Sequence, residues 1–174
     1  VGALSAEWNG FGVLHTAAAR VGGLDLGFVP GANGVKAGDM LAAMDVLFLL
    51  GADEMDFSAR KAGFTVYIGS HGDAGAHHAD VILPGATYTE KSGTWVNTEG
   101  RVQMGNRAGF APGEAREDWA IIRALSDVLG HKLPFDSLSA LRADLYRAYP
   151  HFAALDEIVA GNVDEITALG QKAG

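Results

Sequence analysis

The sequence of 174 residues contains no cysteine. Without thiols, these residues form neither disulfides nor thiolate zinc sites. They also hold no iron–sulfur cluster through cysteine, the usual ligand of such clusters. Any metal site in this chain would therefore depend on histidine and carboxylate side chains.

Basic residues are few and scattered. The chain has 13 lysines and arginines against 21 aspartates and glutamates, and its net charge is −8. Nucleic acids and anionic membrane surfaces are bound by concentrated positive charge, which this sequence lacks. Nucleic acid is therefore excluded as an expected partner.

Long apolar runs are a third absence. The apolar run Val46 to Leu50 has the length of a strand, whereas a helix that spans a bilayer needs about 20 apolar residues. We therefore expect no direct membrane insertion. The start, Val1 to Leu4, has neither an initiator methionine nor the basic region of a signal peptide. The chain is expected to be a processed product or a fragment of a longer protein.

Glycine, in contrast, is abundant, with 24 residues, about twice the average usage of soluble proteins. Many tight turns between strands and helices would account for this number. Strands are predicted at 45–51, 64–69 and 79–83, and short helices at 37–43 and 56–62. This alternation predicts an α/β fold with a doubly wound, mostly parallel sheet. The uninterrupted apolar strand at 45–51 is typical of burial on both faces.

The remaining segments complete the predicted secondary structure. They are an amphipathic helix at 5–21, a short strand at 24–30, a polar stretch at 84–112 that is extended near 96–102, and helices at 117–129, 137–149 and 164–169. The helix at 117–129 is expected to bury one stripe, made of Trp119, Ile122, Leu125 (or Ile121), Val128 and Leu129. A boundary near Pro134 would separate an α/β domain, residues 1–133, from a small helical C-terminal extension, residues 134–174.

Small and polar residues follow each predicted strand of the sheet. The sequences are Gly51-Ala52-Asp53, Gly69-Ser70-His71 and Pro84-Gly85. Ligands of doubly wound folds bind beyond the carboxyl ends of the strands, where glycine lets a phosphate approach the backbone. The same residues are also typical of plain tight turns. Because none of the turns carries a GxGxxG or Walker pattern, the tight turn is the simpler interpretation.

The densest group of metal-ligand residue types lies between two predicted strands. Its members are His71, Asp73, His77, His78 and Asp80. Two histidines and a carboxylate are a plausible zinc or iron set. The spacing, however, matches no standard metal motif and does not fall on one helical face. We therefore predict a hydrogen-bonded polar loop and no metal site.

Acid–base and nucleophilic chemistry have equally weak support. Glu90 and Glu99 are candidates for a carboxylate pair, but nothing in the sequence brings them together. Arg101 near Glu99 is more simply a structural ion pair. No serine lies in the G-x-S-x-G pattern of a nucleophile elbow. No catalytic residue is predicted.

Three consecutive motifs carry a family resemblance. They are Ala-Asp-Val-Ile-Leu-Pro at 79–84, Thr-Glu-Lys-Ser-Gly-Thr at 89–94 and Val-Asn-Thr-Glu-Gly-Arg-Val-Gln at 96–103. This segment resembles the molybdopterin oxidoreductase superfamily. The flanking sequences at 8–25 and 68–77 make the chain similar to the C-terminal part of the large iron–sulfur subunits of NADH–quinone oxidoreductase, respiratory complex I. The resemblance covers essentially the whole chain.

The resemblance implies a scaffold that has lost its molybdopterin cofactor. It implies no catalytic residue, no metal and no bound cofactor in this segment, with iron–sulfur clusters in a missing N-terminal part of the subunit. The candidates for a vestigial cofactor cradle are Gly69, His71, Thr94, Asn97, Glu99 and Arg101. The implied partners are other peripheral-arm subunits of complex I. The implied location is the cytoplasmic side of the bacterial inner membrane, or the matrix side in mitochondria.

Two alternatives stay open at this point. The chain would otherwise be a fragment of a cofactor-binding molybdopterin oxidoreductase, with phosphate or pterin bound at the ends of the strands 46–51 and 64–69. It would also be compatible with an unrelated nucleotide-binding module. Molybdenum, tungsten and pterin content separates the first alternative from the scaffold, and stabilisation by nucleotides tests the second.

Overall fold

A computed structural model describes residues 12–18, 20–60 and 63–158, together with residues 162, 164, 165, 167, 168 and 171. Its helices (α), short 3-10 helices (η) and strands are, in chain order, α1 (Arg20–Asp25), α2 (Ala37–Ala43), β1 (Val46–Leu50), η1 (Phe57–Ala59), β2 (Phe64–Gly69), α3 (Ala74–His77), β3 (Val81–Pro84), β4 (Gly93–Val96), β5 (Val102–Gly105), α4 (Asp118–Val128), α5 (Leu138–Ala148) and η2 (Pro150–Ala153).

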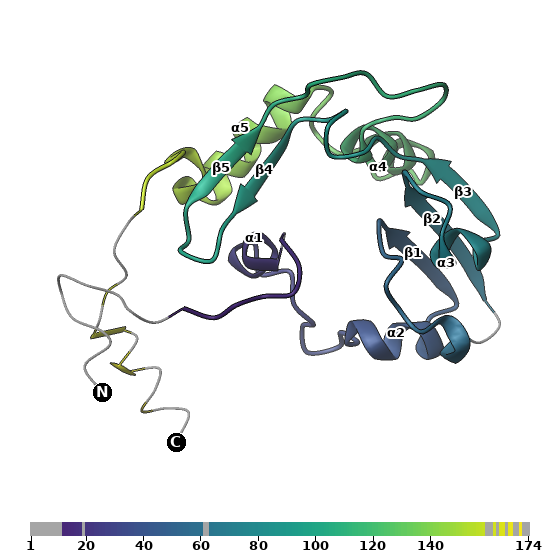
Figure 1. The fold of residues 1–174 in the computed structure, drawn as a ribbon, viewed down its shortest axis with the longest axis horizontal. Helices are drawn as coiled ribbons and strands as arrows, with labels where there is room; N and C mark the ends of the chain where they lie inside the picture. Colours follow the sequence, from purple (N-terminus) through teal and green to yellow (C-terminus); the bar gives the residue numbers. More distant parts are fainter. Residues whose placement is uncertain are drawn as a thin grey trace.

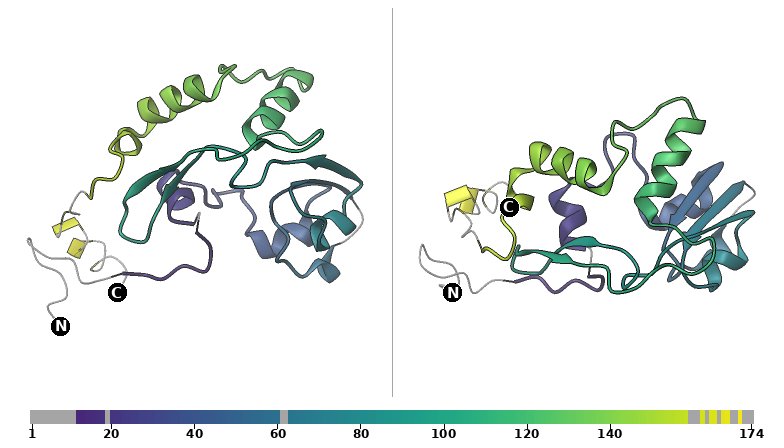
Figure 2. Two further views of the ribbon diagram at one scale, coloured as in Figure 1. Left: turned by 45° about the horizontal axis from the view of Figure 1, so that its top comes forward. Right: turned by 90° about the horizontal axis from the view of Figure 1, so that it is seen from above.

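These elements form an arc (Figures 1 and 2). The sheet of β1, β2 and β3 lies at one end with α4 beside it, and the β4–β5 hairpin lies at the other end with α1 and α5 (Figure 1). Within the described ranges, no helix has the length and apolarity required to cross a membrane. The arc thus consists of two separately packed ends joined along the chain.

The first end contains the predicted parallel sheet, in the order β1-β2-β3. Val46 lies opposite Phe64 in the β1–β2 register, and Val66 lies opposite Val81 in the β2–β3 register. Parallel strands require crossover connections, and η1 and α3 lie in these connections. The structure therefore confirms the α/β class, and β2 has the predicted bounds.

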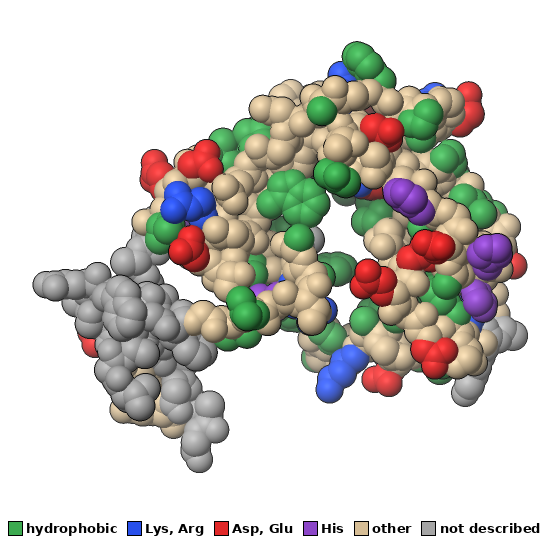
Figure 3. Space-filling model, viewed as in Figure 1, with side chains coloured by type: hydrophobic (Ala, Val, Ile, Leu, Met, Phe, Trp, Pro, Cys, Tyr) green, Lys and Arg blue, Asp and Glu red, His purple; other side chains and the backbone are tan. Residues whose placement is uncertain are grey.

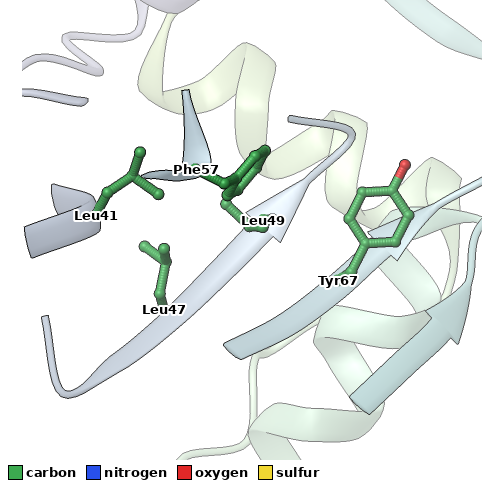
Figure 4. Packing of buried hydrophobic residues seen from close by; sticks show 5 residues of the cluster. All are labelled: Leu41, Leu47, Leu49, Phe57 and Tyr67. Carbon is green, nitrogen blue, oxygen red and sulfur yellow. The ribbon is translucent and has the colours of Figure 1, made fainter. Parts of the chain in front are cut away.

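One face of this sheet packs against α2 and η1. The buried cluster consists of Leu41, Leu47, Leu49, Phe57 and Tyr67. In Figure 4 the hydroxyl of Tyr67 points away from the other four side chains. Full burial of an aliphatic or phenyl side chain contributes about 1.5–3 kcal/mol. This cluster therefore stabilises the sheet from one face.

Arg60 connects the end of α2 to the start of β2. Its Nη1 donates to the carbonyl oxygens of Met44 at 2.7 Å and Leu41 at 3.3 Å, and its Nε donates to Thr65 Oγ1 at 3.0 Å. The last carbonyl groups of a helix have no partner within the helix. Arg60 supplies that partner and fixes where the strand begins.

The other face of β1 is open, so the prediction that this strand is buried on both faces is wrong. Val46, Phe48 and Leu50 are 53%, 47% and 51% exposed, and Phe64 beside them is 47% exposed. We call these four side chains the β1 face. Ile68, farther along the same face, is buried. The described residues thus cover one part of this face and leave the edge strand bare.

The polar stretch at 84–112 contains a hairpin that the sequence patterns did not resolve. β4 and β5 are antiparallel, with Gly93 opposite Gly105 and Val96 opposite Val102. The predicted extended stretch at 96–102 coincides mostly with the turn between them. A Cβ atom on Gly93 would lie 3.0 Å from Trp95 Nε1. Glycine at this position therefore leaves room for the indole.

α5 and η2 pack onto the hairpin. Val96, Val102 and Phe152 form the buried cluster, and Val21, Leu145, Tyr146, Tyr149 and Leu155 surround it. α5 begins where Ser137 Oγ accepts a hydrogen bond from the Ala140 amide at 3.2 Å, a side-chain cap of the kind that favours helix starts. The helices predicted at 117–129 and 137–149 are confirmed, and the described residues Asp164, Glu165, Thr167 and Ala168 are helical.

The predicted helix at 5–21 and the predicted strand at 24–30 are wrong where the structure describes them. Residues 12–18 are not helical, residues 5–11 lie outside the described part, and α1 covers the start of the supposed strand. Gly22 and Gly23 lie inside α1 instead of ending it. A Cβ atom on Gly22 would lie 3.4 Å from Val96 Cγ2. Close packing against the hairpin therefore outweighs the low helix propensity of glycine.

The segment predicted as a helix at 56–62 contains only η1. Asp56 precedes it, and the Asp56 carboxylate accepts a hydrogen bond from the Ser58 amide at 3.0 Å. Hydrogen bonding from the Ser58 side chain and from its amide lowers the pKa of Asp56. The hydrogen bond from the Ser58 amide to Asp56 stabilises the start of η1, which remains a short 3-10 helix and does not extend into the predicted α-helix.

α4 has the predicted bounds within one residue but buries a different set of side chains. Val128 and Leu129 are 85% and 62% exposed, whereas Arg123 is only 9% exposed. Arg123 Nε donates to the carbonyl oxygen of Phe135 at 3.0 Å, and Nη2 donates to Asp136 Oδ1 at 2.5 Å. A buried guanidinium therefore connects α4 to the segment that precedes α5.

We expect Arg123→Ala to lower the free energy of unfolding by about 1–3 kcal/mol, because the carbonyl of Phe135 loses its donor. The matched control is Arg147→Ala, which removes an arginine that is 79% exposed and pairs with Asp144. An exposed ion pair contributes about 1 kcal/mol or less. Urea unfolding followed by circular dichroism measures both, and equal losses would contradict the role of Arg123.

Candidate functional site at the strand ends

The carboxyl ends of β1 and β2 open into a pocket of about 380 Å³. Its ionisable and polar lining residues include Asp53, Tyr67, Ser70, His71, Asp73, Thr87, Tyr88, Lys91 and Asp118. Parallel strands bring these ends to one edge of the sheet, which is where ligands of α/β folds bind. Figure 3 shows acidic side chains over the sheet end of the arc. This edge is the candidate site that the sequence predicted.

Asp53 occupies the space at the start of α3. Its Oδ1 accepts a short hydrogen bond from the Gly75 amide, and its Oδ2 accepts from the Tyr67 hydroxyl at 3.1 Å. A Cβ atom on Gly75 would lie 2.8 Å from Asp53 Oδ1 and 2.9 Å from the carbonyl oxygen of Ala52. Glycine is therefore required here to let the chain's own carboxylate reach the backbone.

Tyr67 fills the space beside Gly69. The side chain of Tyr67 is 3% exposed, and a Cβ atom on Gly69 would collide with the phenol ring and its hydroxyl. The hydroxyl also donates to the carbonyl oxygen of His71, at 2.9 Å. Burial, the hydrogen bond to Asp53 and the negative charges of Asp53 and Asp73 raise the pKa of Tyr67. The glycine at the end of β2 thus makes room for a side chain of the same strand.

Lys91 is the lysine of this pocket, and it is already paired. Its Nζ contacts Asp118 Oδ2 at the first turn of α4, and both side chains are about a quarter exposed. Because the charges of Lys91 and Asp118 cancel, the carboxylates of Asp53 and Asp73 remain as the net charge of the lining. The pocket therefore has an excess of negative charge.

The group of possible metal ligands near the pocket is used in other ways. His71 Nδ1 is hydrogen-bonded to Ser70 Oγ at 2.9 Å, and His78 stacks on Phe57 with ring centroids 5.0 Å apart. Asp80 Oδ2 accepts from the Thr65 amide at 2.7 Å. No group of three histidine or acidic side chains suited to a metal occurs among the described residues. These residues make hydrogen bonds and ring contacts as predicted, but the segment is not wholly a loop, because His77 lies in α3.

The six predicted cradle residues do not come together. Gly69 and His71 line the pocket at the strand ends. Thr94 lies on β4 opposite Met104, and Asn97, Glu99 and Arg101 lie in the hairpin turn. The six residues are therefore divided between the two ends of the arc.

The three predicted residues of the hairpin turn have a structural role. Asn97 Oδ1 accepts from the amides of Glu99 and Arg101, each at 2.9 Å. The Arg101 guanidinium donates to the carbonyl oxygen of Asp156. Arg101 and Glu99, which both lie in the described part of the chain, do not form the predicted ion pair with each other. The backbone carbonyl of Asp156 is thus the partner of the Arg101 guanidinium, in place of the Glu99 carboxylate.

Glu90 and Glu99 do not form a catalytic pair. Glu90 Oε2 accepts from the Thr87 amide at 3.0 Å in the turn before β4, whereas Glu99 lies in the turn after β4.

A second hollow, of about 320 Å³, lies between the hairpin and a group of residues that includes His15, Ala18 and Val21, and Asn97 is part of its lining. Tyr67 and Lys91 were missed at the sequence level. The only sequence signal for Tyr67 was a tyrosine inside an otherwise apolar strand.

Comparisons with known proteins give one family and a consistent set of relatives. The molybdopterin oxidoreductase model matches residues 1–128. The chain is 48% identical over 155 residues to the NADH-ubiquinone oxidoreductase 75 kDa subunit of Reclinomonas americana. It is 52% identical over 155 residues to the mitochondrial 78 kDa subunit of Candida albicans and 45% identical over 166 residues to that of Neurospora crassa.

The matches cover most of this chain but a small share of each relative. In the same order, they include 88%, 88% and 94% of the chain and 22%, 21% and 22% of the relative. The chain therefore spans about a fifth of the length of these relatives.

We expect Asp53→Ala to lower the free energy of unfolding by about 1–3 kcal/mol, because the Gly75 amide loses its acceptor and the Tyr67 hydroxyl keeps only the His71 carbonyl. The matched control is Asp73→Ala, since Asp73 is exposed in the same pocket and makes no side-chain cap. Chemical denaturation compares the two variants. A loss for Asp73→Ala as large as that for Asp53→Ala would rule out the special role of Asp53.

The raised pKa of Tyr67 predicts a loss of stability in alkali. A phenol whose pKa is higher in the folded state stabilises the fold below its unfolded pKa of about 10, and this contribution disappears as the pH rises through the folded pKa. Tyr67→Phe should flatten the fall of unfolding free energy above about pH 10. Denaturation at several pH values measures this slope, with Tyr88→Phe, at an exposed tyrosine, as the control. An unchanged slope in Tyr67→Phe would contradict the prediction.

Proposed function

The chain belongs to the molybdopterin oxidoreductase family, and we propose that it is a cofactor-free scaffold segment of the electron-input subunit of a proton-pumping NADH–quinone oxidoreductase. The family match confirms the resemblance carried by residues 79–103. The names of the similar 75 and 78 kDa subunits support the assignment to that enzyme. In this proposal the segment takes part in the reaction only as structure.

The observation that carries the proposal is that the protein's own side chains pair with the donors at this edge of the sheet. The cofactor that gives the family its name carries phosphate, which requires free donors and positive charge. Here Asp53 uses the Gly75 amide, Asp118 uses Lys91, and Tyr67 occupies the space beside Gly69. The remaining lining charge is negative. These residues do not fit the cofactor, and this supports a segment that binds none.

The same side chains have a clear structural use. Asp53 joins the loop after β1, the end of β2 and the start of α3, while Lys91 and Asp118 join the stretch before β4 to α4. Buried polar groups are stable when they are paired in this way. The polar residues at the carboxyl ends of β1 and β2 therefore hold neighbouring elements in place.

The redox centres and partners belong to the rest of the proposed subunit. Because this sequence has no cysteine, iron–sulfur clusters would be held by residues outside it. The partners would be other peripheral-arm subunits. The subunit would lie on the cytoplasmic side of a bacterial inner membrane or the matrix side of a mitochondrial one.

Metal and pterin analysis tests the proposal. The enzyme complex purified from its natural source should contain iron and acid-labile sulfide but no stoichiometric molybdenum or tungsten. Oxidation of an extract should release no fluorescent pterin. An established molybdopterin enzyme taken through the same extraction serves as the positive control.

The opposite result would identify the alternative function. Molybdenum or tungsten in a stoichiometric amount, accompanied by pterin, would show a cofactor-binding molybdopterin oxidoreductase. In that case the carboxylate of Asp53 and the phenol of Tyr67 would have to leave the strand edge.

A further inference from the structure

The β1 face is an apolar surface on a strand whose outer edge is also unpaired. β1 is the first strand of the three-stranded order, with β2 on one side and no paired strand on the other among the described residues. Its five residues, Val-Leu-Phe-Leu-Leu, include no charged or polar side chain. Exposed edge strands normally carry charges, proline or bulges that prevent further pairing. β1 has none of these features.

The backbone geometry shows which groups are available at this edge. The Gly51 amide donates to Ile68 and the Phe64 amide donates to Asp45, at 2.7 Å each. Alternate residues of a parallel strand bond to the same neighbour, so Leu47 and Leu49 direct their backbone groups towards β2. Phe48 and Leu50 direct theirs outwards.

The side chains add a second open surface at right angles to the edge. The four residues of the β1 face are each about half exposed. α4 follows the bridge between Gly85 and Arg116 and therefore starts at the β3 side of the sheet. It leaves the β1 side uncovered. Among the described residues, the same strand thus lacks both a neighbour at its outer edge and a helix over the β1 face.

We propose that the rest of the same polypeptide completes this sheet with a strand–helix unit. Its strand would pair in parallel with the outer edge of β1, and its amphipathic helix would place aliphatic side chains on the β1 face. This inference rests on the proposed function, since it requires a longer subunit. The matched relatives supply the length, because this chain covers only 21–22% of them.

A second copy of this chain fits the surface less well. Two β1 edges related by a two-fold axis would pair antiparallel across one continuous sheet. The β1 face of each copy would then lie on the same side of that sheet and stay exposed to water. A strand–helix unit covers the edge and the face together, as helices cover parallel sheets in α/β proteins.

Amide hydrogen exchange of the purified full-length subunit, resolved to single residues by fragmentation mass spectrometry, tests the proposal. The Leu47 and Leu49 amides are the internal control, because β2 protects them in either case. The Phe48 and Leu50 amides should exchange within about tenfold of the rates of this control pair. Exchange of Phe48 and Leu50 that is more than about tenfold faster would overturn the proposal. Unprotected exchange of all four amides would overturn it as well.

Two further measurements distinguish a strand–helix unit of the same polypeptide from a second copy of the chain on the β1 face. Sedimentation of the same sample should show a monomer with protected amides, and protection that appears only in a dimer would assign the face to a second copy. Phe48→Asp should lower the melting temperature of the subunit by more than about 4 °C, whereas Phe110→Asp, at a loop residue that is 82% exposed, should change it by less. Equal shifts would count against a buried Phe48. Where Phe48→Asp does not fold, exchange in the unchanged subunit decides.

None of these outcomes depends on metal or pterin content. Stoichiometric molybdenum with protected Phe48 and Leu50 amides would end the scaffold proposal and leave the completed sheet in place. The absence of molybdenum with unprotected amides would do the reverse.

Discussion

The carboxylate of Asp53 is the contact on which the arrangement of the strand ends depends. It accepts from the Gly75 amide and the Tyr67 hydroxyl, so it connects the loop after β1 with both β2 and α3. A hydrogen bond to a charged acceptor is stronger than one between neutral groups, and here the acceptor belongs to the protein. At an edge that binds anionic ligands in related folds, the Gly75 amide is thereby already occupied by the protein's own carboxylate.

The two ends of the arc use separate cores, which explains why the polar contacts between segments matter. Leu47 and Leu49 belong to the cluster of the sheet, whereas Val96 and Phe152 belong to the cluster of the hairpin. Neither cluster is large, and small cores leave little margin of stability. The Arg123 contacts with Phe135 and Asp136 bridge α4, which contributes to neither cluster, to the segment before α5.

The sequence predicted best where local patterns and tertiary packing agree. The parallel strands were found because apolar runs end in glycine, and α5 because an apolar stripe follows a capping serine. The helix predicted at 5–21 was expected to end at Gly22, whereas α1 continues through this glycine because Gly22 packs against Val96, a contact distant in sequence. The strand ends were identified as the candidate site, but the role of Tyr67 was not, because only its folded position shows that it fills the space beside Gly69.

The uniform composition of β1 has a consequence for strand register. A slip by one residue normally exchanges polar and apolar faces and is therefore strongly disfavoured. In β1 both faces are apolar, so burial alone distinguishes the alignments poorly. The correct alignment must then be selected at the ends of the strand. The Phe64 amide donates to the Asp45 carbonyl at the start of β1, and the Gly51 amide donates to the Ile68 carbonyl at its end. The hydrogen bond between the Gly75 amide and Asp53 fixes the loop that follows. The polar contacts at this edge thus specify which alignment of the sheet forms, in addition to holding it together.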